Sequence, residues 1–113
     1  YVAAPMQQIV GEALRPEERQ DPRRVAEAKT TLDKSYAWLS RRIESTWAAG
    51  AVFTIADCAA APALFYSDWV HGIPDGNLKT YRARLLARPS VARTVDEARP
   101  YRKFFPLGAP DRD

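Results

Sequence analysis

The sequence has very few of the residues from which metal and redox sites are built. It contains one cysteine, Cys58, and one histidine, His71, among 113 residues. A single cysteine excludes a disulfide within the chain and fits a reducing, cytoplasmic location, and a single histidine excludes a histidine-based metal cluster. The five glycines are isolated, so no glycine-rich phosphate-binding loop is present. We therefore expect no metal and no tightly bound cofactor on these residues.

A segment suited to a membrane is also missing. The longest apolar run, residues 55–70, is short for a bilayer span and is interrupted by Pro62. Position 1 is Tyr rather than Met, and no charged leader with an apolar stretch and a small-residue cleavage site follows it. We expect no membrane partner, and we expect these residues to be a piece of a longer polypeptide.

Basic charge is concentrated toward the C-terminus. Residues 77–113 carry nine basic and four acidic side chains, a net charge of +5 in a chain whose overall net charge is +3. The arginines are scattered around helical faces: Arg82, Arg84, Arg88, Arg93, Arg99 and Arg102. Because no docking motif accompanies them, we interpret them as a solvated basic surface and do not expect a nucleic-acid partner.

Helical periodicity extends through most of the chain, and strand-like alternation is not seen. The longest apolar stripe lies within a helix predicted over residues 22–49, where apolar side chains recur every three or four residues: Val25, Ala28, Leu32, Tyr36, Leu39, Ile43 and Trp47. The pattern predicts further helices at 1–14, 55–70, 78–87 and 89–98. The predicted fold class is all-α, a helical bundle with one domain over residues 1–107 and a frayed tail at 108–113.

Residues 55–70 are predicted to form the buried central helix of the bundle, because they have no polar face. The helix begins with a predicted capping box, in which the Thr54 hydroxyl accepts from the N–H of Asp57 and the Asp57 carboxylate accepts from the N–H of Thr54. This structural role accounts for Asp57 without a catalytic one. We interpret Cys58 as an inert core thiol and His71 as a surface residue in the loop that follows.

Three side chains from the first and central helices, Tyr1, Met6 and Tyr66, could line an apolar ligand pocket between those helices. The same residues would equally fill the core or a subunit contact. The sequence leaves both interpretations open.

Four motifs resemble the C-terminal helical domain of bacterial glutathione S-transferases. They are Trp47-Ala48-Ala49-Gly50, Phe53-Thr54-Ile55-Ala56-Asp57, Ala63-Leu64-Phe65-Tyr66 and Arg84-Leu85-Leu86-Ala87-Arg88-Pro89-Ser90-Val91. The set is fairly specific, and the resemblance extends from about Tyr1 to Phe105, nearly the whole chain. Ala51 departs from the pattern, in which Asp often follows the glycine.

The resemblance implies a helical half of a transferase with no catalytic residue of its own. Glutathione, the co-substrate, would be bound and activated on an N-terminal thioredoxin-like domain that these residues do not contain. The helical domain would contribute walls of the site for a small apolar electrophile, nearest to Tyr1, Pro5, Met6 and Ile9, and part of a homodimer contact. Thr54 and Asp57 match the structural capping box of that family.

A second function class stays open. The same fold could serve as a non-catalytic interaction module in an RNA- or translation-associated assembly, which the basic C-terminal third would suit. Salt-dependent retention on RNA would favour that alternative.

Overall fold

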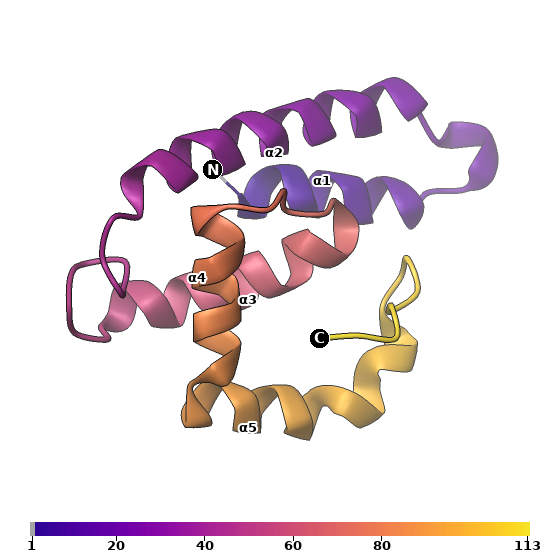
Figure 1. Ribbon diagram of the computed structural model, residues 1–113. Helices are drawn as coiled ribbons and strands as arrows, with labels where there is room; N and C mark the ends of the chain where they lie inside the picture. The colour runs from indigo at the N-terminus through magenta and orange to yellow at the C-terminus, as the bar shows by residue number, and fades with distance from the viewer. Residues whose placement is uncertain (1) are drawn as a thin grey trace.

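The computed structural model describes residues 2–113, and within that range the chain is all-α with no β-strand, as predicted (Figure 1). The α-helices are α1 (Ala3–Ala13), α2 (Pro22–Arg42), α3 (Ile55–Val70), α4 (Asn77–Ala87) and α5 (Pro89–Ala98). Two short 3₁₀ helices, η1 (Glu17–Arg19) and η2 (Arg99–Phe104), complete the structure.

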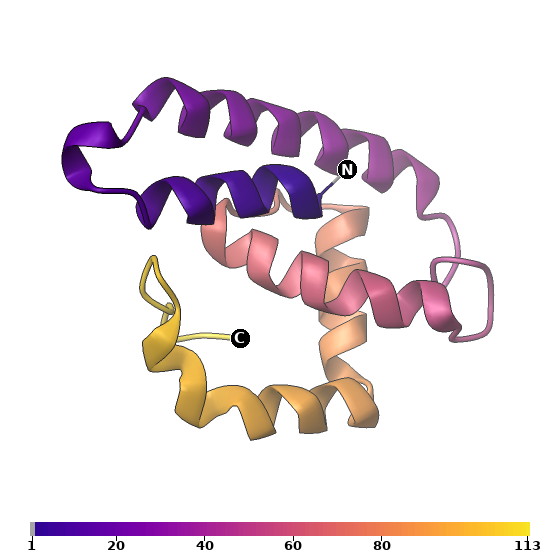
Figure 2. The ribbon, with the colours of Figure 1, turned by 180° about the vertical axis from the view of Figure 1, so that it is seen from behind.

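Helices α1 and α2 form a pair, α3 and α4 pack against this pair, and α5 with η2 forms an outer arm. Helices α1 and α2 lie side by side and antiparallel, joined by the turn that contains η1 (Figures 1 and 2). Helix α3 packs against α1 and α4, and α4 also packs against α2. Helix α5 and η2 continue from the far end of α4, away from the α1–α2 pair (Figure 2).

The core lies where α1, α2, α3 and α4 meet. The buried apolar cluster consists of Val2, Ile9, Ala28, Leu32, Tyr36, Leu64, Ile73, Leu78, Tyr81 and Leu85. Every residue of the predicted 22–49 stripe is in this cluster or packs against it. The stripe therefore identified the core-facing side of α2 correctly.

The predicted end of the second helix was wrong, because α2 ends at Arg42 rather than near residue 49. Ile43 is extended, and the chain then makes a tight turn in which Trp47 and Gly50 exchange both backbone hydrogen bonds, at 2.9 and 3.2 Å. Gly50 has a φ of +132°, so it closes this turn rather than capping the helix. The Trp47 ring packs edge-on against Phe53, which anchors the turn to the start of α3.

Helix α3 has the predicted bounds, but only part of it is buried. In its second half Leu64, Phe65, Ser67 and Asp68 are buried. In its first half one side is open, and Ile55 is 85% exposed. The reason is that α1 and α4 cover α3 on two sides only, while α5 stands off from it.

A buried arginine joins α4 to α3. Arg82 donates from Nε to the Leu64 carbonyl at 3.2 Å and from Nη2 to the Phe65 carbonyl at 3.1 Å. The same guanidinium lies 3.7 Å from the buried carboxylate of Asp68. The contact fixes the angle between the two helices through polar groups that water does not reach.

The C-terminal segment folds back toward α3. Phe105 packs on the α3 aromatics, whereas Tyr101 and Phe104 of η2 are 66% and 70% exposed. Within the tail that the sequence predicts to be frayed, Arg112 and Asp113 form ion pairs with Asp68, Arg99 and Arg102.

None of the helices described between residues 2 and 113 combines the length and the apolar character that a membrane crossing requires.

Candidate functional site: an apolar cavity beside the central helix

An apolar cavity of about 770 Å³ lies between α3 and the outer arm of the molecule. Helix α1 contributes Met6, Gln7 and Val10 at one end, and α3 contributes the floor from Cys58 to Trp69. Helix α5 and η2 form the opposite wall, and Phe105 and Pro106 follow them. A volume of this size is in the range that binds drug-sized molecules, about 300–1,000 Å³.

The cavity has an aromatic wall made largely by α3. The Phe65 and Trp69 rings lie 4.6 Å apart, measured between centroids, and Tyr66 and Trp69 meet edge-on at 5.6 Å. Phe105 closes this group from the other side, stacked on Tyr66 at 5.9 Å and edge-on to Trp69 at 5.4 Å. Such a wall favours flat apolar ligands, because offset and edge-on ring contacts contribute binding energy beyond that of the buried area.

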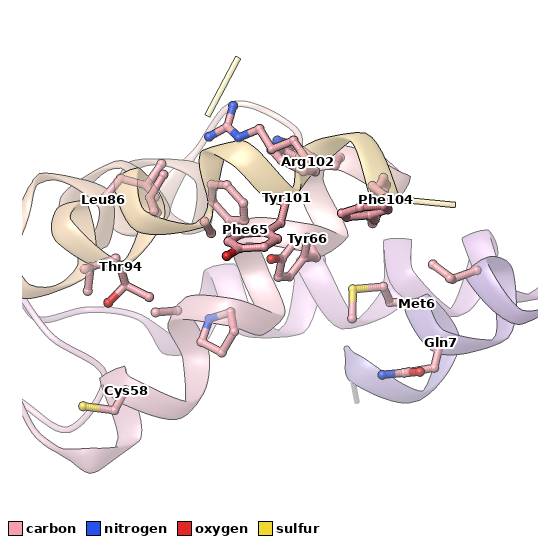
Figure 3. Close-up of a pocket in the computed structure, with 18 of the residues that line it drawn as sticks. Met6, Gln7, Cys58, Phe65, Tyr66, Leu86, Thr94, Tyr101, Arg102 and Phe104 are labelled. Atoms are coloured by element: carbon pink, nitrogen blue, oxygen red, sulfur yellow. The ribbon is translucent and has the colours of Figure 1, made fainter. Parts of the chain in front are cut away.

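Few polar groups face the cavity, and Cys58 is one of them. Gln7, Ser90, Thr94 and Arg102 are also in the lining. The interpretation of Cys58 as a core thiol was wrong, since its side chain is exposed and lies at the opposite end of the cavity from Met6 and Gln7 (Figure 3). An all-apolar helix face does not reveal which side neighbours cover, and here the Cys58 side is open.

The predicted ligand-site residues divide into two groups. Met6 and Tyr66 both line the cavity, and Figure 3 shows Met6 reaching from α1 toward Tyr66. Pro5 and Ile9 do not line it: both are buried, and Ile9, 4% exposed, belongs to the core cluster. Tyr1 lies outside the residues that the structure describes.

The wall formed by α5 and η2 was not predicted. Its signal was present in the sequence as the single apolar face that Val91, Val95 and Ala98 give to the helix at residues 89–98. Those side chains are only partly buried and face the cavity. Periodicity identifies an apolar face, but it does not state whether protein or a ligand covers that face.

The start of α3, which positions the cavity floor, is held by Asp57. The Asp57 side chain is fully buried, and its Oδ2 accepts from the Thr54 N–H at 2.9 Å. The Thr54 hydroxyl accepts from the backbone of the first helical turn, including the Ala56 N–H at 3.3 Å, and together these bonds make a capping box. Asp57 Oδ1 also accepts from the Ala48 N–H at 2.9 Å and from the Tyr81 hydroxyl at 2.5 Å.

These hydrogen bonds set the electrostatics of the buried carboxylate. Burial by itself raises the pKa of Asp57, but the bonds from Ala48, Tyr81 and Thr54 outweigh it and hold the pKa below the ordinary value. Burial and the bond to Asp57 together raise the pKa of the Tyr81 hydroxyl. Asp57 is therefore a charged carboxylate, and both of its oxygens accept hydrogen bonds from the protein, as suits a structural role.

The remaining candidates for chemistry are engaged elsewhere. His71 Nε2 lies 2.6 Å from Asp33 Oδ1, and the His71 carbonyl accepts from the Tyr36 hydroxyl at 2.8 Å, so this residue ties the loop after α3 to α2. Within residues 2–113, no group of three or more His, Cys, Asp or Glu side chains has the arrangement of a metal site.

Comparison with protein families gives one match. The model of the glutathione S-transferase, C-terminal domain, matches residues 22–93, which extend from the start of α2 into α5. No curated protein and no solved structure matched the chain. The matched region is more than half of the chain, and it contains the capping box and the aromatic face of α3. The chain therefore belongs to the glutathione S-transferase C-terminal domain family.

Proposed function

We propose that this chain is the helical half of a glutathione transferase-like enzyme, in which its cavity binds the small apolar electrophile. Glutathione, the co-substrate, would be bound and activated on a thioredoxin-like partner domain. The chain itself supplies walls and no reactive group, together with part of a homodimer contact. The single observation that carries this proposal is the aromatic-lined cavity of about 770 Å³ beside α3.

The composition of the cavity supports an apolar ligand. Its floor and sides are mainly aromatic and aliphatic, with Met6 at one end and Tyr66 in the middle. A thioether and aromatic rings adapt to ligands of several shapes, which suits a site for varied electrophiles. Because one side of the cavity is open, a second domain could place a thiolate against a ligand held there.

The basic C-terminal third is largely occupied by contacts within the chain, which disfavours the RNA-associated alternative. Arg82 is buried against α3, and Arg84 donates to the Thr46 carbonyl. Arg88 lies over the Phe53 ring, and Arg93 pairs with Glu97. Phosphate binding needs cationic groups that are free to displace counterions along one face.

A binding experiment tests the cavity directly. The neutral dye N-phenyl-1-naphthylamine, whose fluorescence rises in apolar surroundings, is titrated into the chain and into the variant Thr94→Trp. Thr94 is an exposed lining residue on α5, so an indole there should fold normally and fill the cavity. We expect the dye to bind the unmodified chain. Its affinity for the variant should be lower by about tenfold or more, which corresponds to a loss of about 1.4 kcal/mol of binding free energy.

The control is Thr30→Trp on α2. Thr30 is also exposed, and its hydroxyl donates to the carbonyl four residues earlier at 3.0 Å, as that of Thr94 does. Thr30 does not line the cavity. Equal loss of affinity in both variants, or no binding to the unmodified chain, would show that the cavity is not the ligand site.

The division of labour is tested by catalysis. Conjugation of glutathione to 1-chloro-2,4-dinitrobenzene is measured with the 113-residue chain alone, and we expect no turnover above the uncatalysed rate because the proposal assigns activation of the thiol to the partner domain. Turnover by the chain alone would contradict the proposed division between two domains.

A further inference from the structure

The last residues of the chain form a strap along one side of the cavity. We define the strap as residues 105–113; in both views it turns back from η2 into the space between α3 and α5 (Figures 1 and 2). Two backbone hydrogen bonds are described for it, from Phe105 to the Arg102 carbonyl and from Gly108 to the Phe105 carbonyl. Regular secondary structure therefore does not hold the strap in place.

Side-chain ion pairs hold it instead. Arg112 Nη1 donates to Asp68 Oδ2 at 2.7 Å, and Nη2 donates to the Asp68 backbone carbonyl at 3.1 Å. Asp68 is only 3% exposed, so this contact joins the strap to a carboxylate inside the bundle. We call the contact between Arg112 and Asp68 the latch.

The Asp68 carboxylate keeps other partners when the latch is open. Its Oδ1 accepts from the Ile73 N–H at 2.7 Å, and Arg82 lies 3.7 Å from its Oδ2. Loss of Arg112 therefore leaves no uncompensated buried charge. The latch can be removed without unfolding the domain, because Arg82 and the Ile73 N–H remain.

A second contact closes the strap on itself. The Asp113 carboxylate accepts from Arg99 at 2.7 and 2.8 Å and from Arg102. Both arginines belong to η2, so the end of the strap returns to the helix from which the strap began. The strap is thus a loop that is closed at both ends on η2.

The strap contributes to the cavity wall. Phe105 and Pro106 line the cavity, and Phe105 stacks on Tyr66 and packs edge-on against Trp69. Arg112 has half of its side chain in solvent, so dissolved salt can reach the latch and screen it.

We propose that the strap is a gate for the cavity, in which the Arg112–Asp68 latch holds Phe105 in the wall and so sets how fast apolar ligands enter and leave. The inference rests on the proposed function in taking the cavity as a ligand site. The gate is a mobile element, and membership of the family does not by itself imply it.

Stopped-flow fluorescence with N-phenyl-1-naphthylamine measures the gate on the 113-residue chain. For Arg112→Ala we expect the dye to dissociate about three- to tenfold faster, the effect of losing a charge-assisted hydrogen bond to a half-exposed arginine. Arg112→Lys keeps a cation beside Asp68 and is expected to restore most of the slow rate. Arg41→Ala removes an exposed arginine of α2 and is expected to leave the rate unchanged.

Salt separates the latch from a general loss of packing. Raising sodium chloride should speed dissociation from the unmodified chain and have a smaller effect on Arg112→Ala, because the screened contact is already missing. An equal salt response in the two proteins would contradict the latch.

A second readout needs no ligand. Trypsin cleavage between Lys103 and Phe104, followed by mass spectrometry, is expected to be severalfold faster in Arg112→Ala than in the unmodified chain or Arg41→Ala. If the dye fails to bind the unmodified chain, the proposed function is wrong, and the cleavage rate alone decides whether the strap is latched. If the dye binds but neither rate responds to Arg112→Ala, the gate is wrong and the proposed function stands.

Discussion

At the scale of single residues, Asp57 accepts hydrogen bonds from more segments of the chain than the capping-box spacing predicts. The spacing of Thr54 and Asp57 identifies a helix start, and the structure shows the capping box there. The sequence gives no sign that the same carboxylate also accepts from Ala48 and Tyr81, nine residues before it and 24 after it. Those two bonds depend on how the chain folds, so no local rule predicts them.

The loss of this side chain should therefore cost more than the loss of a surface helix cap. We expect Asp57→Ala to lower the free energy of unfolding by about 2–4 kcal/mol, because it leaves buried N–H and O–H donors without an acceptor. Tyr81→Phe removes only one of the bonds and is expected to cost about 1 kcal/mol. Urea unfolding followed by circular dichroism measures both, and equal stability of Asp57→Ala and the unmodified chain would refute the role assigned to Asp57.

At the scale of elements, the sequence predicted the helices whose limits are set locally. Thr54 defines the start of α3, and Pro89 opens α5 at its first residue. The end of α2 was missed because no proline or glycine stands between residues 42 and 49. That end is decided by the turn at Trp47 and Gly50 and by the hydrogen bond from Ala48 to Asp57, both of which are tertiary features.

The contact between α4 and α3 depends on Arg82, a residue that charge counting assigned to the solvated surface. We expect Arg82→Met to lower the free energy of unfolding by about 2–3 kcal/mol, because two carbonyls of α3 lose a charged donor inside the core. Arg84→Met, on the same helix, removes one hydrogen bond to the Thr46 carbonyl and is expected to cost under about 1 kcal/mol. Chemical denaturation measures the free energy of unfolding of both variants. Similar decreases would show that Arg82 contributes no more to stability than Arg84 does.

At the scale of the whole molecule, only a small part of the candidate site could be predicted from the sequence, namely Met6 and Tyr66. Met6 and Tyr66 were identified because they combine an apolar character with a place on the first and central helices. The opposite wall, from Val91 to Phe105, was not, because its distance from α3 follows from the angle at which α5 leaves α4. Burial of an apolar face and exposure of that face to a cavity leave the same pattern in the sequence.

Three aspartates should make the stability of the whole chain fall in acid. Hydrogen bonds hold the pKa of Asp57 and Asp68 below the ordinary value despite the opposing effect of burial, and bonds from Arg99 and Arg102 lower that of Asp113 to about 2. A carboxylate whose pKa is lowered by folding stabilises the folded state above its unfolded pKa, about 3.9, and ceases to do so as the pH falls through the folded value.

Thermal unfolding at a series of pH values measures this effect. We expect the contribution of these carboxylates to be constant from neutral pH down to about pH 5 and to decline from about pH 4 toward pH 2. Asp57→Asn should flatten that decline, since one of the titrating groups is gone. A melting temperature that does not change between pH 5 and pH 2 would contradict the assignment.

The short loop that Asp57 closes has a consequence for the order in which the chain folds. Its bond to Ala48 spans nine residues, whereas the latch from Arg112 to Asp68 spans 44. Closing a short loop costs less chain entropy, so the turn before α3 is expected to be formed already in the folding transition state and the latch only after it. Loss of the Asp57 carboxylate would then slow folding, while loss of the Arg112 guanidinium would mainly speed unfolding. We therefore expect the domain to assemble from its middle outward, with residues 105–113 docking last.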